Sequence, residues 1–435
     1  MTEEREPPEG PPPEPEGGGG LTALEQESAG GAITPAARLA AYVRGGGIVV
    51  PILTAGLAFF VGGLVMLFTG SDPIATYEAI WNGTGLQWFL PWTTDRETAA
   101  LNLQQTLIVT TPLILTGLAV AFAFRAGLFN IGGQGQYIVG AIAAVWVGSE
   151  LGSLPGAPHV ILAIVAACAA GALWAGIAGF LKASTGANEV ISTIMLNYVA
   201  LWIGVYLFSL GGPLQNDRDP SLPVSNDIVE AAHLPVFWGD PVLQGLHIGI
   251  FVALLAALAF WLLLNRSTTG YEVRAVGLNP EAARYSGMNV GKNYVLVMAV
   301  CGLFAGLAGS LDVLGWQFRL ATNDIQETQY GFLGIAVALL GRNTASGTVA
   351  AALLFGALVS GTSQRNLDPT IFEPSLASNL TLIIQGLVVL IVSADVLVLS
   401  ALRRGRGLVG RGPGRPGPTP ATVEARAMGA PGEDR

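Results

Sequence analysis

Apolar residues along the chain are gathered into ten long runs separated by short polar breaks. The runs lie near 49–70, 103–122, 127–149, 160–181, 189–209, 247–264, 293–313, 331–341, 346–362 and 379–400. Most approach about 20 residues, the length that a helix needs to cross a bilayer. The run at 331–341 is too short for a full crossing, which predicts a broken or re-entrant helix buried by its neighbours. The pattern predicts an all-α fold: a polytopic helical membrane protein with about ten transmembrane segments.

Composition supports this class and sets the limits of the domain. The chain has 435 residues, of which 51% are hydrophobic and only 12% charged, against roughly a quarter charged in a soluble protein. Residues 1–40 are acidic and rich in Pro and Gly, and residues 403–435 are rich in Arg, Gly and Pro. Neither segment has the apolar residues needed for a core, so we expect two disordered tails around a transmembrane domain at 49–400. The N-terminal segment also lacks the basic region of a signal peptide.

The distribution of Lys and Arg predicts the orientation. If ten segments cross, twelve basic residues share one side: Arg38, Arg44, Arg125, Lys182, Arg266, Arg274, Arg284, Lys292, Arg342, Arg403, Arg404 and Arg406. The opposite loops hold four, namely Arg96, Arg218, Arg319 and Arg365. Basic residues are enriched in cytoplasmic loops. Both termini and the loop at 265–292 are therefore predicted to be cytoplasmic.

A polar, glycine-rich stretch opens the third apolar run. In "GLFNIGGQGQY", Asn130, Gln134, Gln136 and Tyr137 accompany glycines that lower helix propensity. At 100° per residue, Asn130, Gln134 and Tyr137 would share one helical face. An unwound or kinked start, with amides facing protein or water, is typical of substrate sites in transporters. The alternative is that the glycines allow close helix contact and the amides join helices.

A second polar patch opens the fifth run. In "ANEVISTIMLNY", Glu189, Ser192, Thr193 and Asn197 cover one face of a helix. Polar residues that face the interior of a bundle mark solute pathways. For Asn188 and Glu189 the alternative is a capping residue and a charge that complements the helix dipole. For the deeper residues, pathway and helix-contact roles both stay open.

Charges at membrane depth are scarce. Glu189, Asp312 and Asp395 all lie near the ends of apolar runs, whereas ion-coupled carriers usually need ionisable groups at mid-depth. Amides and hydroxyls instead suit an uncharged, hydroxyl-rich solute. The three histidines lie in or beside predicted external loops without metal-ligand spacing, and no nucleophile stands at depth. We therefore expect no catalytic residue, no metal and no cofactor.

The loop at 265–292 predicts a short, rigid helix. Asn279 is a suitable N-cap, Pro280 fits the first turn, Glu281 complements the dipole and Gly287 can end the helix. A capped helix flanked by arginines is suited to docking on another protein; the alternative is a loop helix that rests on lipid headgroups. The residues predicted to dock are Arg274, Asn279, Pro280, Glu281, Ala282, Ala283, Arg284 and Gly287.

The chain carries no recognisable ATP-binding loop. The nearest match, "GMNVGKN", has three residues between its glycines instead of four, and Asn293 stands where a Ser or Thr should bind Mg²⁺. Energy for transport must come from a partner or from a gradient.

Four motifs in order, "GLFNIGGQGQ", "ANEVISTIMLNY", "TTGYEVRAVGLNPEAARYSGMNV" and "GFLGIAVALLGRNTASG", closely resemble the permease subunits of bacterial ABC importers for nucleosides and simple sugars. That group lies within the family that also serves ribose and branched-chain amino acids, and the resemblance covers most of 49–400. One departure is Gln134, where members of the family often carry Glu.

The resemblance implies a plasma-membrane complex. Its parts are two permeases, which we expect to differ from one another, two ATPase subunits and an extracytoplasmic solute-binding lipoprotein. It also implies that the region from Asn279 to Gly287 couples to the ATPase, and that Asn130–Gln136 and Asn188–Asn197 contribute to the translocation pathway. The alternative function is a secondary transporter for a small polar solute that needs no ATPase.

Overall fold

The computed structural model describes residues 49–68, 72–151, 154–240 and 245–363, with Ile383 and Gly386 as isolated additions. The predicted tails at 1–40 and 403–435 and almost all of the apolar run at 379–400, including Asp395, lie outside the described residues. The chain divides into two units, Met1–Ile52 and Leu53–Arg435, and the architecture below is that of the second unit.

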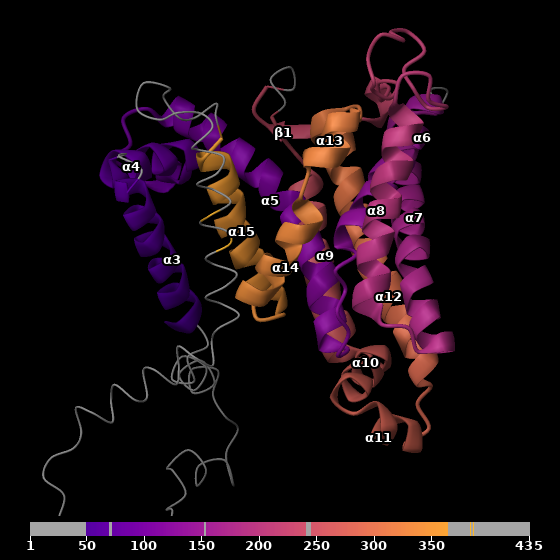
Figure 1. The fold of residues 1–435 in the computed structure, drawn as a ribbon. Helices are drawn as coiled ribbons and strands as arrows, with labels where there is room; N and C mark the ends of the chain where they lie inside the picture. Colours follow the sequence, from indigo (N-terminus) through magenta and orange to yellow (C-terminus); the bar gives the residue numbers. More distant parts are fainter. Residues whose placement is uncertain are drawn as a thin grey trace, which may run out of the picture. The chain divides into compact units, whose positions relative to one another are not determined.

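Helices occupy the first nine predicted apolar runs in the part of the chain that the structure describes (Figure 1). They are α3 (Val49–Phe68), α5 (Arg96–Arg125), α6 (Gly133–Glu150), α7 (Gly156–Thr185), α8 (Glu189–Phe208), α9 (Gly249–Arg266), α12 (Val290–Asp312), α14 (Tyr330–Leu340) and α15 (Ala345–Gly361). Five described segments are long and apolar enough to cross a membrane: α5, α7, α8, α9 and α12 with its continuation to Gln317. The mostly helical class is confirmed, whereas ten crossings and a re-entrant helix stay predictions.

Several short elements in the polar breaks were not predicted. They are α4 (Pro73–Thr84), α10 (Thr268–Leu278), α13 (Thr322–Glu327), the 3₁₀ turns η1 (Leu86–Phe89) and η2 (Glu230–Ala232), and the strands β1 (Val236–Trp238) and β2 (Leu246–His247). The strands pair antiparallel, Val236 opposite His247, so the all-α prediction omitted a small ribbon. For α4 a local signal was present: the Asp72 carboxylate accepts a hydrogen bond from the amide of Ile74 at 2.8 Å, and Gly85 ends the helix at φ +70°.

Burial separates central helices from peripheral ones. In the most apolar window of each helix, 83% of α5 and 67% of α12 is buried, against 28% of α7 and 22% of α8. The outer faces of α7 and α8 carry large exposed apolar side chains, among them Leu173, Trp202 and Tyr206. Water would not favour so much exposed apolar surface, whereas lipid does not penalise it.

Glycines let α12 lie close to α6 and α7. A Cβ at Gly306 would collide with the carbonyl of Ala167 on α7, and one at Gly302 would collide with that of Gly171. On the other side, a Cβ at Gly140 of α6 would collide with Gly306 itself. Small residues at this spacing allow helix backbones to touch in membranes, so α12 is fixed between its two neighbours.

Candidate functional site

The polar stretch before α6 is unwound. The helix begins at Gly133, not near residue 127, and Gly127 upstream has φ +69°. The Asn130 amide forms two hydrogen bonds with the Gln136 amide, at 2.9 and 3.0 Å, and accepts one from the Gly132 amide at 3.0 Å. The unwound start is confirmed. The shared helical face was wrong for Asn130, because this residue lies ahead of the helix and folds back on its first turn.

Two further amides join this unwound start to other helices. Asn197 of α8 accepts a hydrogen bond from the Gly135 amide at 2.8 Å and donates one to the carbonyl of Ile131 at 2.9 Å. Gln134 donates to the carbonyl of Thr328 at 2.5 Å and accepts from the amide of Gly331, at the start of α14, at 3.0 Å. Asn130, Gln134, Gln136 and Asn197 are all at most 5% exposed. These four amides form one cluster, which we call the amide junction, where α6, α8 and α14 meet.

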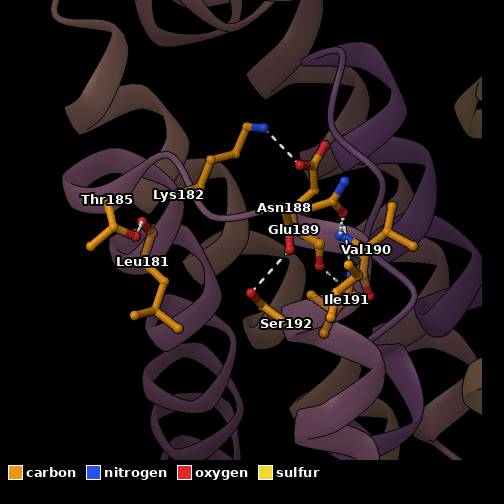
Figure 2. A network of polar contacts seen from close by, with 9 residues as sticks. Leu181, Lys182, Thr185, Asn188, Glu189, Val190, Ile191 and Ser192 are labelled. Atoms are coloured by element: carbon orange, nitrogen blue, oxygen red, sulfur yellow. Dashed lines mark hydrogen bonds and ion pairs between the residues drawn. The ribbon is translucent and has the colours of Figure 1, made fainter.

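The start of α8 is organised by local contacts (Figure 2). The Asn188 side chain accepts hydrogen bonds from the second and third amides of the helix, at 2.9 and 3.3 Å, which confirms it as the cap. Glu189 pairs with Lys182 of α7 at 2.6 Å. The hydroxyls of Ser192 and Thr193 donate to the carbonyls four residues before them, at 3.0 and 2.7 Å. Of these residues, Thr193 is buried towards the amide junction, and Glu189 is buried beside Lys182.

A buried carboxylate, that of Asp312, lies on α12. The sequence analysis placed this residue near the end of an apolar run. α12 continues without a break into a π-helical turn, η4 (Val313–Gln317), so Asp312 lies inside the segment and is 3% exposed. Its carboxylate accepts hydrogen bonds from the Tyr137 hydroxyl of α6 and from the Gln317 amide, the latter at 2.6 Å. The apolar residues after Asp312, "VLGW", are the signal that could have extended the helix.

The segment 209–235, which we call the strap, ties the same ends of α6 and α12 together. The amide of Val229 donates to the carbonyl of Gly148 at 3.0 Å, and that of Leu234 donates to Leu314 at 2.9 Å. Beyond the strap, the His247 ring packs against Gly315 and accepts a hydrogen bond from the Gly249 amide at 3.1 Å. Burial lowers the pKa of His247 to about 4.

The loop at 265–292 folds into two short helices. As predicted, Asn279 caps α11 (Pro280–Tyr285): its side chain accepts from the amides of Glu281 and Ala282, both at 3.0 Å. Gly287 follows at φ +85°. Buried Ala283 packs with Val276 of α10 and Val290 of α12, which fixes the loop to the start of α12.

Several side chains of α10 and α11 are highly exposed. Leu278 is 89% exposed and Tyr285 93% exposed, and Pro280, Glu281, Ala282 and Arg284 are exposed with them. Arg274 lies apart on α10 and is half-buried. The helix pair therefore presents two large, almost fully exposed side chains, one aliphatic and one aromatic.

Comparison with known proteins identifies the class. The family model described as "Branched-chain amino acid transport system / permease component" matches residues 102–393. The chain is 41% identical to the guanosine ABC transporter permease protein NupP of Bacillus subtilis over 353 residues, which cover 81% of this chain and 94% of the relative. It is 37% identical to the glucose permease protein TsgB13 of Haloferax volcanii, over 72% of this chain and 80% of that one. No solved structure matches the chain.

The helical bundle, its exposed apolar faces and these matches define a multi-pass membrane transport protein. The chain belongs to the branched-chain amino acid transport permease family, the transmembrane subunits of ABC importers. It is a transport subunit and not an enzyme.

Proposed function

We propose that the chain forms the translocation pathway for nucleosides or related simple sugars. The observation that carries this proposal is the similarity to NupP, which extends over 81% of this chain and 94% of the relative. A nucleoside permease protein of Lactococcus lactis, 32% identical over 72% of this chain, supports it as well. Amides and hydroxyls buried in the bundle match the hydroxyl groups that nucleosides and sugars share.

The proposed pathway residues are the four of the amide junction, Tyr137 of α6 and four residues at the start of α8. They are Asn130, Gln134, Gln136, Tyr137, Asn188, Glu189, Ser192, Thr193 and Asn197. In the described conformation the amides of the junction bind to one another and to backbone groups, which is also what a purely structural joint would do. Our proposal is that α6, α8 and α14 separate here during transport, and that the junction then exchanges internal hydrogen bonds for those of the solute.

Transport by this permease is proposed to depend on three kinds of partner: ABC ATPase subunits, a second and different permease, and an extracytoplasmic solute-binding lipoprotein. Two guanosine permease proteins of one organism, NupP and NupQ, are both similar to this chain, at 41% and 32% identity. Such a pair supports a heterodimer. The proposed location is the bacterial plasma membrane, with both termini and α10–α11 on the cytoplasmic side.

The proposed mechanism is alternating access driven from outside the chain. ATP closes the partner ATPases, α11 moves with them, and α12 carries the motion into the bundle because Ala283 packs against its first residue, Val290. α12 in turn contacts α6 through Gly306 and Gly140, and α6 carries the amide junction.

The coupling proposal is tested at the two exposed tips. Leu278→Ser and Tyr285→Ser together should reduce ATP-dependent uptake at least tenfold, and should release ATPase subunits from the purified permease. Because both side chains are about nine-tenths exposed, the fold itself should be unaffected. Leu210→Ser, at a 62%-exposed position beyond α8, is the matched control. Undiminished uptake by the double variant rejects α11 as the docking element.

The substrate proposal is tested by uptake into cells that lack their own nucleoside and sugar importers. Expression of the chain with ABC ATPase, second-permease and lipoprotein subunits from the same organism should allow saturable uptake of labelled guanosine or glucose. Competition with unlabelled nucleosides and sugars then identifies the preferred class. Uptake of branched-chain amino acids without uptake of nucleosides or sugars would overturn the proposal.

A further inference from the structure

A cavity of about 650 Å³ lies beside the bundle, away from the amide junction. Its walls come from the end of α5, from α9 between Leu254 and Asn265, from α10, and from the turn that joins α14 to α15 with the first residues of α15. The residues that characterise it are Arg125, Leu254, Leu258, Trp261, Arg274 and Asn343. None of the proposed pathway residues lines it.

Two arginines give the cavity a positive end. Arg125 donates through Nε to the carbonyl of Asn343 at 2.9 Å, and Arg274 donates through Nε to the carbonyl of Gly270 at 3.2 Å. Each bond uses one of the five N–H groups of a guanidinium. Within the described ranges, neither arginine forms an ion pair with a carboxylate. As far as the described residues go, the cavity therefore offers an anion two guanidinium groups that have no carboxylate partner.

The turn beside Arg125 is a second unusual feature. Arg342 and Asn343 both adopt the left-handed conformation, at φ +52° and +53°. Two consecutive non-glycine residues in this region are uncommon and cost free energy. The strained turn holds the Asn343 carbonyl against Arg125, so the position of this guanidinium is fixed by the backbone.

The rest of the wall is mostly apolar and runs along α9 from Asn265 back to Leu254. From Leu254 to Asn265 the helix rises ~16 Å, about half the thickness of the hydrocarbon core. Leu254 and Leu258 are 42% and 51% exposed. Near the charged end, Arg266 lies over the Trp261 ring at 5.6 Å. Trp together with Arg is typical of the membrane–water interface.

We propose that this cavity binds one anionic phospholipid. The phosphate lies between Arg125 and Arg274, the polar groups of the turn receive the rest of the headgroup, and an acyl chain follows Leu258 and Leu254 along α9. A free phosphate would leave the apolar wall unused, and a zwitterionic lipid would bring a trimethylammonium cation next to the two guanidiniums. Basic pockets between membrane helices on the cytoplasmic side bind anionic headgroups for the same reason. This inference does not depend on which solute is transported.

The test is lipid binding to the purified importer complex, measured by native mass spectrometry. Phosphatidylglycerol and phosphatidylcholine with identical acyl chains are titrated in detergent. The wild type should retain phosphatidylglycerol in preference. Arg125→Gln and Arg274→Gln should each weaken its binding about fivefold, since one basic residue contributes about that factor at a lipid surface. Arg125→Lys, which keeps the charge, should retain most of the preference.

The control is Lys292→Gln, an exposed basic residue at the first turn of α12 that does not line the cavity; it should bind lipid as the wild type does. An unchanged Tm and an unchanged size-exclusion profile show that each variant is folded. Equal binding of the two lipids, or an unchanged preference in both Gln variants, overturns the proposal. Full displacement of the lipid by glycerol phosphate would also overturn it, because the site would then be one for soluble phosphate.

Discussion

At the scale of single residues, several buried polar groups have specific partners on neighbouring elements. Asp312 is the clearest case, because its carboxylate lies among apolar helices and depends on the Tyr137 hydroxyl and the Gln317 amide. A buried hydrogen-bond acceptor that loses one such partner is left partly unsatisfied. The residue therefore links α6 to the end of α12 through a pair whose members depend on each other.

Tyr137→Phe should lower the free energy of unfolding by about 1–3 kcal/mol, because Asp312 then keeps a single donor. Asp312→Asn alone should also destabilise the protein. The double variant should lose less free energy of unfolding than the two single variants added together, because the second substitution removes an interaction that is already lost. Tm values of the four proteins in one detergent give the coupling. Strict additivity would mean that the two side chains do not interact.

His247 provides a prediction of pH dependence. Its native pKa is about 4, whereas that of an unfolded His is about 6.5. Between these values the unfolded chain binds a proton that the native one does not, so stability falls as pH decreases from about 6.5 to 4. The loss at pH 4 should reach about 3 kcal/mol. His247→Gln should flatten this part of the Tm–pH curve; an unchanged slope contradicts the assignment.

At the scale of elements, the position of α12 is fixed by direct backbone contacts with α6 and α7. A Cβ on Gly306 would collide with the carbonyl of Ala167 on α7, and a Cβ on Gly140 of α6 would collide with Gly306. Gly176, on the same helix as Ala167, meets nothing within 4 Å of where its Cβ would be. Close packing therefore leaves no room for a side chain at Gly306, whereas Gly176 has room for one, although both residues lie in apolar helices.

Gly306→Ala should lower Tm and the yield of folded protein, since α7 must move to admit the methyl group. Gly176→Ala should leave Tm unchanged or raise it, because alanine favours a helix by roughly 0.5–1 kcal/mol over glycine. Thermal unfolding of both variants by the same assay decides the matter. A Gly306→Ala protein as stable as Gly176→Ala would refute the close contact.

The helices themselves were largely predictable from the sequence, because membrane helices need long apolar runs. α8 was predicted at 189–209 and lies at Glu189–Phe208, and the Asn279 cap of α11 followed from residue types alone. The π turn after Asp312 was not predictable, since its geometry depends on contacts with the strap and His247.

The candidate site was predictable in part. Its residue types drew attention to Asn130, Gln134 and Asn197, but which groups they bind depends on how α6, α8 and α14 meet in space. The cavity that contains Arg125 and Arg274 joins segments about 150 residues apart in the sequence, and no local pattern reports such proximity.

At the scale of the whole molecule, the chain has a polar junction inside the bundle and a protruding helix pair, and its sequence carries no ATP-binding loop. The features at the two places suit different tasks: solute contact at the amide junction, and force from a partner at α11. Membership of the ABC permease family fits this division. The central claim is that the chain provides the route and a partner provides the energy.

Uptake into proteoliposomes tests this claim most directly. Vesicles with the complete complex, ATP inside and the binding protein outside should concentrate the labelled solute, and ATP depletion should stop accumulation while an uncoupler should not. Vesicles with the permease chain alone should concentrate nothing. Uphill uptake by that single chain, driven by an ion gradient, would contradict the account.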